Sequence, residues 1–292
     1  MLRRHLVECL PSRKRGGRVE VSLVQWSRLE GTIKMEWIEW ALSREFRQFI
    51  LDNNLFFPLL FVGRFVGITT IELIWPTRVI EYRKVVLKDL TVALLYFFVI
   101  FPSAVYLDGW IAIRPNLPDA ILTLPFPLRV FCYFVVADFG HYWIHRLMHT
   151  KYVWRIHKWH HAPKYMYWLA GVRGTVPQQV IVNLPYIFAW SFLGLTPWWM
   201  ELAIGAFNGL QNDWMHVNVT WRSNWLEWFV VTPRYHHIHH SNSPLHYKAN
   251  LAALFTIWDR LFGTYVDPDS IKEPLTFGIG EDVPFVRLAV GV

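Results

Sequence analysis

The segment Asp138-Phe-Gly-His-Tyr-Trp-Ile-His145-Arg-Leu-Met-His149 contains the first of three histidine clusters that decide how this chain folds. The second cluster is His157-Lys-Trp-His160-His161, and the third is His236-His237-Ile-His239-His240. Residues three and four apart share one face of a helix. If each cluster is helical, several of its imidazoles therefore point in the same direction.

Twelve of the thirteen histidines lie between His141 and His246, and this concentration predicts a metal site. Neutral imidazole is the most common protein ligand for borderline transition metals. A single histidine is more often a packed core residue, but buried imidazoles in such numbers cost free energy unless each ring nitrogen has a partner. His216, which stands alone at the end of the polar stretch 211–216, is a further candidate ligand.

The composition predicts an all-α integral membrane protein. Of the 292 residues, 53% are apolar and 17% are aromatic, proportions that are unusual for a soluble domain. Four stretches approach the roughly 20 apolar residues that a membrane-spanning helix needs, at about 55–75, 90–113, 120–136 and 180–207. We therefore expect roughly four transmembrane helices or hairpins. Pro185 and Pro197 interrupt the last stretch, which is as compatible with a helical hairpin as with one span.

The charge distribution predicts which side of the membrane holds the histidines. Residues 76–88 carry four Lys or Arg, so this loop should face the cytoplasm, and the histidine clusters should return to the same side. Either the bacterial inner membrane or the endoplasmic reticulum fits this arrangement. Arg64 lies inside the first apolar stretch and argues against a straight crossing there, because a buried arginine is costly in a bilayer.

The first 34 residues differ from the rest of the chain. They contain eight Lys or Arg against three acidic residues and lack the uninterrupted apolar core of a signal peptide. We interpret residues 1–34 as a basic, disordered extension, with Met35 as an alternative start, and residues 35–292 as a single membrane-embedded domain. The net charge of +7 does not indicate nucleic-acid binding, because the basic residues are scattered around apolar spans and fit anionic lipid headgroups better.

At its histidine motifs the chain resembles the fatty acid hydroxylase or sterol desaturase superfamily of membrane di-metal oxygenases. Residues 138–149 are similar to the first histidine box of that superfamily, 154–161 to the second and 233–240 to the last. Asn250 and the segment 258–264 are similar to its trailing signature. Within the superfamily, residues 169–178 and 214–216 look most like the alkylglycerol monooxygenase branch.

The resemblance implies a cytoplasmic helical cap in which nine histidines hold two metal ions. The nine positions are His145, His149, His157, His160, His161, His216, His236, His239 and His240. The implied metal is iron, which zinc can replace in a purified protein. Asp138 and Asp259 are expected to orient metal-bound imidazoles by accepting hydrogen bonds from them, and Asn250 is expected to lie near the site. His141, His237 and His246 are not expected to be ligands.

The implied reaction is O2-dependent hydroxylation of a C–H bond in a fatty acyl, ether lipid or sterol-like substrate. The sequence has no dinucleotide-binding fingerprint and no haem-binding segment, so electrons would come from a separate reductase or carrier, such as cytochrome b5, ferredoxin or a reduced pterin. A lipid desaturase or a carotenoid or sterol hydroxylase would use the same centre. An alternative of a different class is a membrane metal-binding protein without catalysis.

Overall fold

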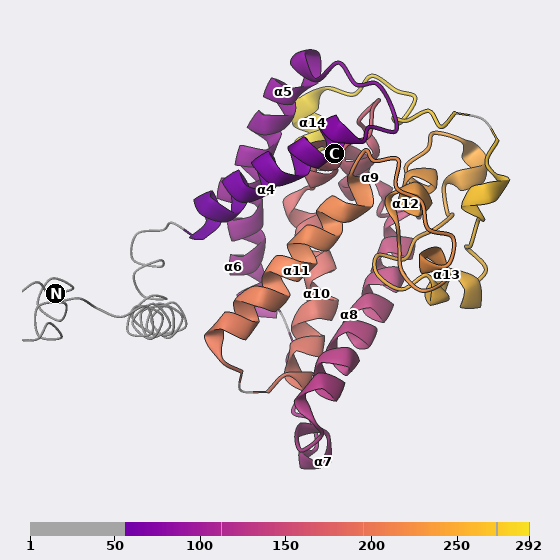
Figure 1. Cartoon of the computed structure of the whole chain (residues 1–292). Helices are drawn as coiled ribbons and strands as arrows, with labels where there is room; N and C mark the ends of the chain where they lie inside the picture. The colour runs from indigo at the N-terminus through magenta and orange to yellow at the C-terminus, as the bar shows by residue number, and fades with distance from the viewer. Residues whose placement is uncertain (1–55, 112, 195, 273, 292) are drawn as a thin grey trace, which may run out of the picture. The chain divides into compact units, whose positions relative to one another are not determined.

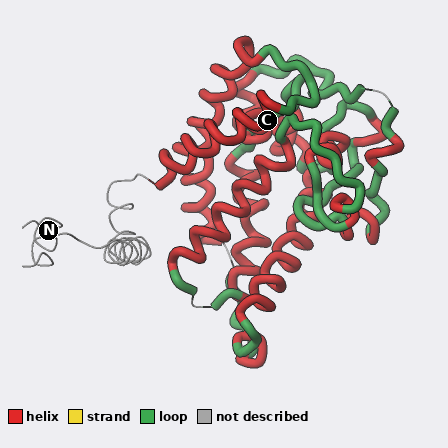
Figure 2. The backbone as a smooth tube through the Cα atoms, viewed as in Figure 1, coloured by secondary structure: helices red, strands yellow, loops and turns green. Residues whose placement is uncertain are grey.

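Helices joined by loops make up the whole described part of the chain (Figures 1 and 2). The structure, a computed structural model, describes residues 56–291 except 112, 195 and 273. No strand occurs among these residues, so the prediction of an all-α protein is confirmed for them. Residues 59–292 form one compact unit. The expected basic extension 1–34 and the domain boundary at residue 35 lie outside the described residues.

One long helix near the start of the described chain is apolar enough to cross a membrane. It follows α4 (Phe56–Ile74) and consists of α5 (Tyr82–Leu95), the π-helical turn η1 (Tyr96–Ile100) and α6 (Phe101–Ile111). These three elements are continuous over 30 residues, and among the described residues only this helix meets the length and hydropathy of a span. This helix overlaps the second expected span, the apolar stretch 90–113.

The other expected spans are shorter or more polar than the sequence pattern suggested. α8 (Phe126–Met148) is 23 residues long, but it carries Arg129, Asp138 and Arg146. α10 (Val176–Ala189) has only 14 residues, fewer than the roughly 20 that a straight crossing requires. α11 (Trp198–His216) has 19 residues and includes the acidic Glu201 and Asp213.

The stretch 180–207 forms two helices rather than one span. α10 continues through Pro185 and passes into the 3-10 turn η3 (Trp190–Phe192), and α11 begins directly after Pro197. Between them Gly194 has φ 65°, a left-handed conformation that glycine adopts without a steric penalty. The hairpin alternative therefore describes this region better than the single span.

The long helices bring the histidine-bearing segments to one end. α8 packs along α10, and α10 packs along α6. The chain beyond α11, residues 217–291, is loop-rich, and we call it the cap (Figure 2). The remaining short helices are α7 (Asp119–Leu122), α9 (Trp154–His161), η2 (Trp168–Val172), η4 (Leu226–Trp228), α12 (Pro233–His239), η5 (Pro244–His246), α13 (Ile257–Leu261), η6 (Pro268–Ser270) and α14 (Phe285–Val290).

Buried ion pairs and carboxylates tie α4 and α5 to the segments that carry the histidines. Arg64 of α4 donates from Nε and Nη2 to the two carboxylate oxygens of Asp213, at 2.6 and 2.5 Å. Asp89 of α5 forms a buried ion pair with Arg173, directly after η2. Arg64 therefore has a protein partner on α11, which removes the cost of an unpaired buried arginine.

Candidate metal centre

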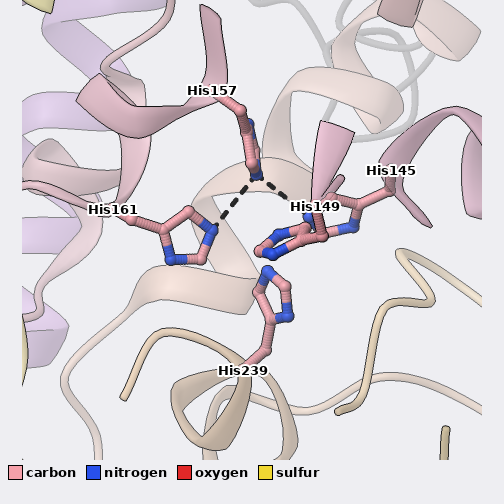
Figure 3. A group of neighbouring side chains, drawn as sticks. All are labelled: His145, His149, His157, His161 and His239. Atoms are coloured by element: carbon pink, nitrogen blue, oxygen red, sulfur yellow. Dashed lines mark hydrogen bonds between the residues drawn. The ribbon is translucent and has the colours of Figure 1, made fainter. Parts of the chain in front are cut away.

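Nine buried or half-buried histidines form two groups, each with ligand atoms within 4.8 Å of one another. Group one consists of His145, His149, His157, His161 and His239. Group two consists of His160, His216, His236 and His240. Figure 3 shows the imidazoles of group one pointing toward a common centre. These are the nine positions that the sequence indicated.

Two short helices each contribute to both groups. On α9, His157 and His161 are one turn apart and face group one, whereas His160 faces group two. On α12 the division is reversed, because His236 and the C-cap His240 face group two and His239 faces group one. The rings of His161 and His240 stack with centroids 4.3 Å apart, so the two groups are adjacent.

Local capping explains why α12 begins where it does. The hydroxyl of Thr232 accepts a hydrogen bond from the backbone N–H of Tyr235 at 3.3 Å, and Pro233 occupies the first helical turn. Both are favourable at a helix N-terminus. The helix consequently starts three residues before His236 and sets the direction of the three imidazoles that follow.

Backbone carbonyls determine which ring nitrogen faces the centre in four of the histidines. A carbonyl oxygen can only accept, so the imidazole Nδ1 beside it carries the proton and Nε2 carries a lone pair. The four pairs are His145 with Leu251 at 2.7 Å, His239 with Ala249 at 2.9 Å, His160 with Arg173 at 3.0 Å and His216 with Asn212 at 2.6 Å. In each of them Nε2 is available as a ligand atom.

The approach of these Nε2 atoms fits a bound cation. Nε2 of His216 lies 3.3 Å from Nε2 of His160, and both atoms carry lone pairs, so no proton joins them. In group one, the buried Nε2 atoms of His149 and His239 have no hydrogen-bond partner. One metal ion between the imidazoles of each group would satisfy these lone pairs, and an all-nitrogen donor set suits a borderline transition metal.

Burial keeps the candidate ligands in the neutral form. Desolvation lowers the pKa of the histidines on α9 and α12 well below the ordinary value of 6.5, and the neighbouring imidazoles lower it further. A neutral imidazole retains the lone pair that a metal needs. The site is therefore ready to bind a cation at neutral pH without first losing protons.

The comparison with known families agrees with this donor set. The model of the fatty acid hydroxylase family matches residues 130–264. This region is therefore similar to the fatty acid hydroxylase family. It contains all nine histidines of the two groups. The resemblance seen in the histidine motifs is thereby confirmed.

Relatives of this chain include several lipid-modifying enzymes. The chain is 30% identical over 154 residues to an alkylglycerol monooxygenase of Xenopus tropicalis, covering 52% of this chain and 34% of that protein. It is 31% identical over 149 residues to the ornithine lipid hydroxylase OlsE of Rhizobium tropici, covering 49% and 44%. It is 26% identical over 162 residues to methylsterol monooxygenase 1-3 of Arabidopsis thaliana, covering 53% of each. The chain thus spans about a third to a half of these relatives. No solved structure matches it.

The two candidate carboxylates, Asp138 and Asp259, support the backbone instead of the imidazoles. Asp259 accepts the backbone N–H groups of Leu251 and Ala252 at 2.7 and 2.8 Å, and Asp138 accepts those of Leu254 and Phe255 at 2.8 Å each. Neither carboxylate accepts a hydrogen bond from a histidine of either group. This differs from the expectation, because backbone groups and other side chains occupy the carboxylate oxygens, and backbone carbonyls accept from Nδ1 of His145, His160, His216 and His239.

Asn250 lies between the two carbonyls that orient group one. Its neighbours Ala249 and Leu251 accept from His239 and His145, respectively. Asn250 has φ 52°, and its side chain binds the backbone of Tyr235 and Val266 at 2.8 to 3.1 Å. Asparagine tolerates the left-handed conformation better than most residues. Its role is therefore to fix the turn that presents both carbonyls.

The three histidines that were not expected to be ligands lie outside both groups. His237 Nδ1 is 2.9 Å from Nη1 of Arg78, and its Nε2 is 3.3 Å from the carbonyl oxygen of His216. Because Arg78 can only donate, Nε2 of His237 carries the proton that the carbonyl accepts. His141 contacts the hydroxyl of Tyr186 at 3.3 Å, and His246 contacts Oγ of Ser241 at 2.6 Å.

Sequence reasoning missed the buried acidic residues of α4 and α5. One carboxylate oxygen of Glu72 accepts the backbone N–H groups of Trp168 and Asn218 at 2.8 and 2.7 Å. It thereby joins the start of η2 to the segment directly after His216. Asp89 accepts the hydroxyl of Tyr167 at 2.8 Å and pairs with Arg173. The signal was present, because acidic residues within or beside apolar stretches are rare unless they have partners.

Proposed function

We propose that this protein is a membrane di-iron oxygenase that uses O2 to hydroxylate a C–H bond of a lipid. The observation that carries the proposal is the division of nine imidazoles into adjacent groups of five and four, each with its ligand atoms within 4.8 Å of one another. The named relatives act on an alkylglycerol, an ornithine lipid and a methylsterol. A fatty acyl, ether lipid or sterol-like molecule is therefore the proposed substrate class.

The protein's own residues would hold and orient the metal ions. Group one would bind one ion and group two the other, while the carbonyls of Ala249 and Leu251 keep two of the imidazoles in the correct tautomer. Iron, when bound, would supply the activation of O2, and zinc can replace it in a purified protein. Burial of both groups excludes bulk water from the reacting centre.

Membrane insertion would bring the lipid to this centre. The helix Tyr82–Ile111 would span the bilayer, with α8, α10 and α11 embedded beside it, giving roughly four membrane helices or hairpins beneath the cap. The loop before Tyr82 contains Arg78, which contacts His237 next to group two. Since this basic loop should face the cytoplasm, the metal centre would lie on the cytoplasmic side of a bacterial inner membrane or of the endoplasmic reticulum.

Electrons would come from outside this chain. The sequence has no dinucleotide fingerprint, so a separate reductase, cytochrome b5, ferredoxin or a reduced pterin would serve as the donor. The similarity to alkylglycerol monooxygenases favours testing the pterin first.

Metal analysis combined with lipid analysis tests the proposal. Protein purified anaerobically should contain two iron ions per chain, and cells that express it should accumulate a lipid product heavier by one oxygen. His160→Ala should abolish the product and lower the metal content, because His160 belongs to group two. His246→Ala is the matched control, because His246 contacts Ser241 outside both groups.

The mass of the product separates the alternatives. A loss of two hydrogens would identify a desaturase with the same centre, because both reactions begin with the same hydrogen abstraction. Full metal occupancy and an unchanged lipid profile in His160→Ala cells would refute the proposed centre. Two tightly bound zinc ions with no lipid product under any donor would favour a metal-binding protein without catalysis.

A further inference from the structure

Several large apolar side chains near the histidine end are exposed, and eight of them lie on three segments. Three lie on α8, two on α13 and three in the loop 221–229 of the cap. We call this set the aromatic belt, and it consists of Phe139, Trp143, Leu147, Ile257, Leu261, Trp225, Trp228 and Phe229. Trp225 is 70% exposed, Phe229 64% and Leu261 62%. Contiguous apolar patches of this size on a protein surface usually mark an interaction site.

Ring contacts join the three segments into one surface. Phe139 of α8 lies 5.1 Å from Trp258 of α13, and Trp143 lies 4.9 Å from Phe262, measured between ring centroids. The guanidinium of Arg260, also on α13, lies 4.1 Å from the ring centroid of Trp228. These contacts connect α8 to α13 and α13 to the loop 221–229.

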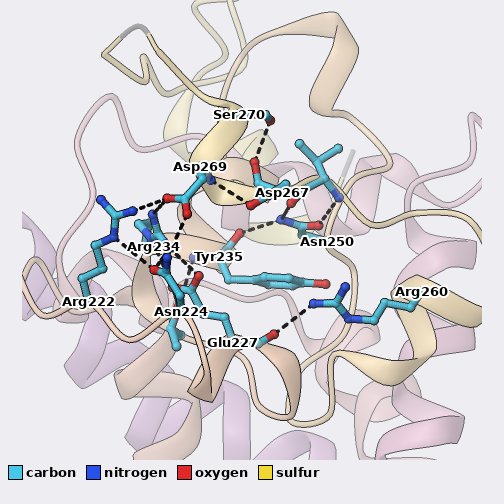
Figure 4. Close-up of polar contacts among 12 residues, drawn as sticks. Arg222, Asn224, Glu227, Arg234, Tyr235, Asn250, Arg260, Asp267, Asp269 and Ser270 are labelled. Atoms are coloured by element: carbon cyan, nitrogen blue, oxygen red, sulfur yellow. Dashed lines mark hydrogen bonds and ion pairs between the residues drawn. The ribbon is translucent and has the colours of Figure 1, made fainter.

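A polar network holds the loop 221–229 in place (Figure 4). Arg234 donates from Nε and Nη2 to the two carboxylate oxygens of Glu227, at 3.1 and 2.5 Å. Asn224 donates to Asp269 at 2.9 Å, and Arg222 pairs with the same carboxylate at 2.5 Å. The exposed rings of Trp225 and Trp228 are thus presented by a braced segment, which lowers the entropy lost when they bind a surface.

Cations accompany the exposed rings. Arg260 stacks between Trp228 and Tyr265, at 4.1 and 3.8 Å from the ring centroids, and Arg146 lies 5.5 Å from the ring of Trp143. Tryptophan beside arginine is typical of the membrane–water interface, where the ring meets the acyl boundary and the guanidinium meets lipid phosphate.

We propose that the aromatic belt lies in the headgroup region of the bilayer and docks the cap onto the membrane surface. Apolar side chains on one face of α8 continue the belt away from the histidines, since Leu128 and Phe131 are also exposed, at 44% and 57%. On a helix embedded in lipid this face would contact acyl chains, and the belt extends it into the cap. The inference rests on the proposed membrane placement. It adds to the membrane-spanning helix a second contact, between the cap and the headgroup region of the bilayer.

Spin-label accessibility tests the proposal in the full chain. Cys9 and Cys132, the two native cysteines, are replaced by Ser, and single cysteines are introduced as Trp225→Cys, Phe229→Cys and Leu261→Cys. The protein is reconstituted into phosphatidylcholine and phosphatidylglycerol bilayers. Val105→Cys, on the helix Tyr82–Ile111, is the control for lipid exposure. Leu245→Cys is the matched control in the cap, because Leu245 is 86% exposed but lies outside the belt.

Relaxation by O2, which concentrates in lipid, is compared with relaxation by an aqueous nickel chelate. The three belt labels should give an O2-to-nickel ratio several-fold higher than the Leu245 label and close to the Val105 label. Belt labels that behave like the Leu245 label would overturn the proposal, because the belt would then face water. Belt labels shielded from both reagents would overturn it as well, in favour of a protein partner or a second copy. A Val105 label in water would show that the membrane placement itself fails.

Discussion

Gly171 lies directly against the imidazole of His216. A Cβ placed on Gly171 would be 2.2 Å from Cγ of His216 and 2.5 Å from its Nδ1, far closer than real contacts allow. The same Nδ1 donates to the carbonyl of Asn212, so the ring is held between η2 and its own helix. The absence of a side chain at residue 171 therefore permits the position of a group two ligand.

Gly171→Ala should selectively impair group two. The added methyl group must push the His216 ring away from His160, which breaks the convergence of Nε2 atoms, and changes of this kind typically cost about 10–100-fold in metal affinity. Titration of the metal-free protein with Fe²⁺ or Zn²⁺ should show one site near normal affinity and one weakened site. Gly174→Ala is the matched control, since the atom nearest to its Cβ would be the side-chain nitrogen of Gln178 at 3.4 Å. Two unchanged sites in Gly171→Ala would contradict the steric argument.

Helical spacing indicated the three histidine clusters, and the resemblance to the superfamily implied all nine group members, but neither could assign them to two groups. The assignment depends on how α9 and α12 face each other. His160 of α9 belongs to group two, whereas His239 of α12 belongs to group one. Hydropathy indicated the stretch 90–113, which overlaps the apolar helix Tyr82–Ile111. It did not show that the helices at the stretches 120–136 and 180–207 extend further and include Asp138 and Asp213. The role of Gly171 depends on contact between distant segments, which no local pattern encodes.

Asp259→Asn should weaken group one more than Asp138→Asn does. Asp259 accepts four hydrogen bonds, including the N–H of Leu251, whose carbonyl orients His145. An asparagine would place its NH2 group against these donors, and leaving a buried donor unsatisfied costs about 1–3 kcal/mol. Asp138 braces residues 254, 255 and 258, which accept nothing from a histidine of either group.

The comparison requires two measurements on both variants. Both should lower the free energy of unfolding, whereas only Asp259→Asn should lower the metal affinity of group one. Equal metal affinity in the two variants would show that the orientation of the Leu251 carbonyl does not matter for binding.

Removal of the metal should destabilise the cap. The ligands come from α8, α9, α11 and α12, and they meet only in the folded state, so metal binding adds to folding stability. At a free metal concentration about 1,000 times Kd the gain is about 4 kcal/mol per site. Chelation should therefore lower the melting temperature and increase amide hydrogen exchange in α9 and α12. His246→Ala should respond to the chelator as the wild type does, and a melting temperature indifferent to chelation would rule out a structural contribution from the metal.

Replacing both Arg64 and Asp213 by apolar residues should cost little stability, whereas replacing only one of them should be strongly destabilising. Both side chains are buried, with 9% and 1% exposure, and Asp213 lies three residues before His216 on α11. Arg64→Met should cost about 3–5 kcal/mol, because it leaves a buried carboxylate without its cation. The double variant Arg64→Met/Asp213→Leu removes both charges and should recover most of that loss, since apolar replacements of buried pairs are often neutral.

Urea unfolding in micelles measures the free energy of unfolding of each variant, and the metal content shows whether His216 is still in position. If the double variant is as unstable as Arg64→Met alone, the attraction between the two charges holds α4 against α11, and the absence of an unpaired buried charge is not sufficient.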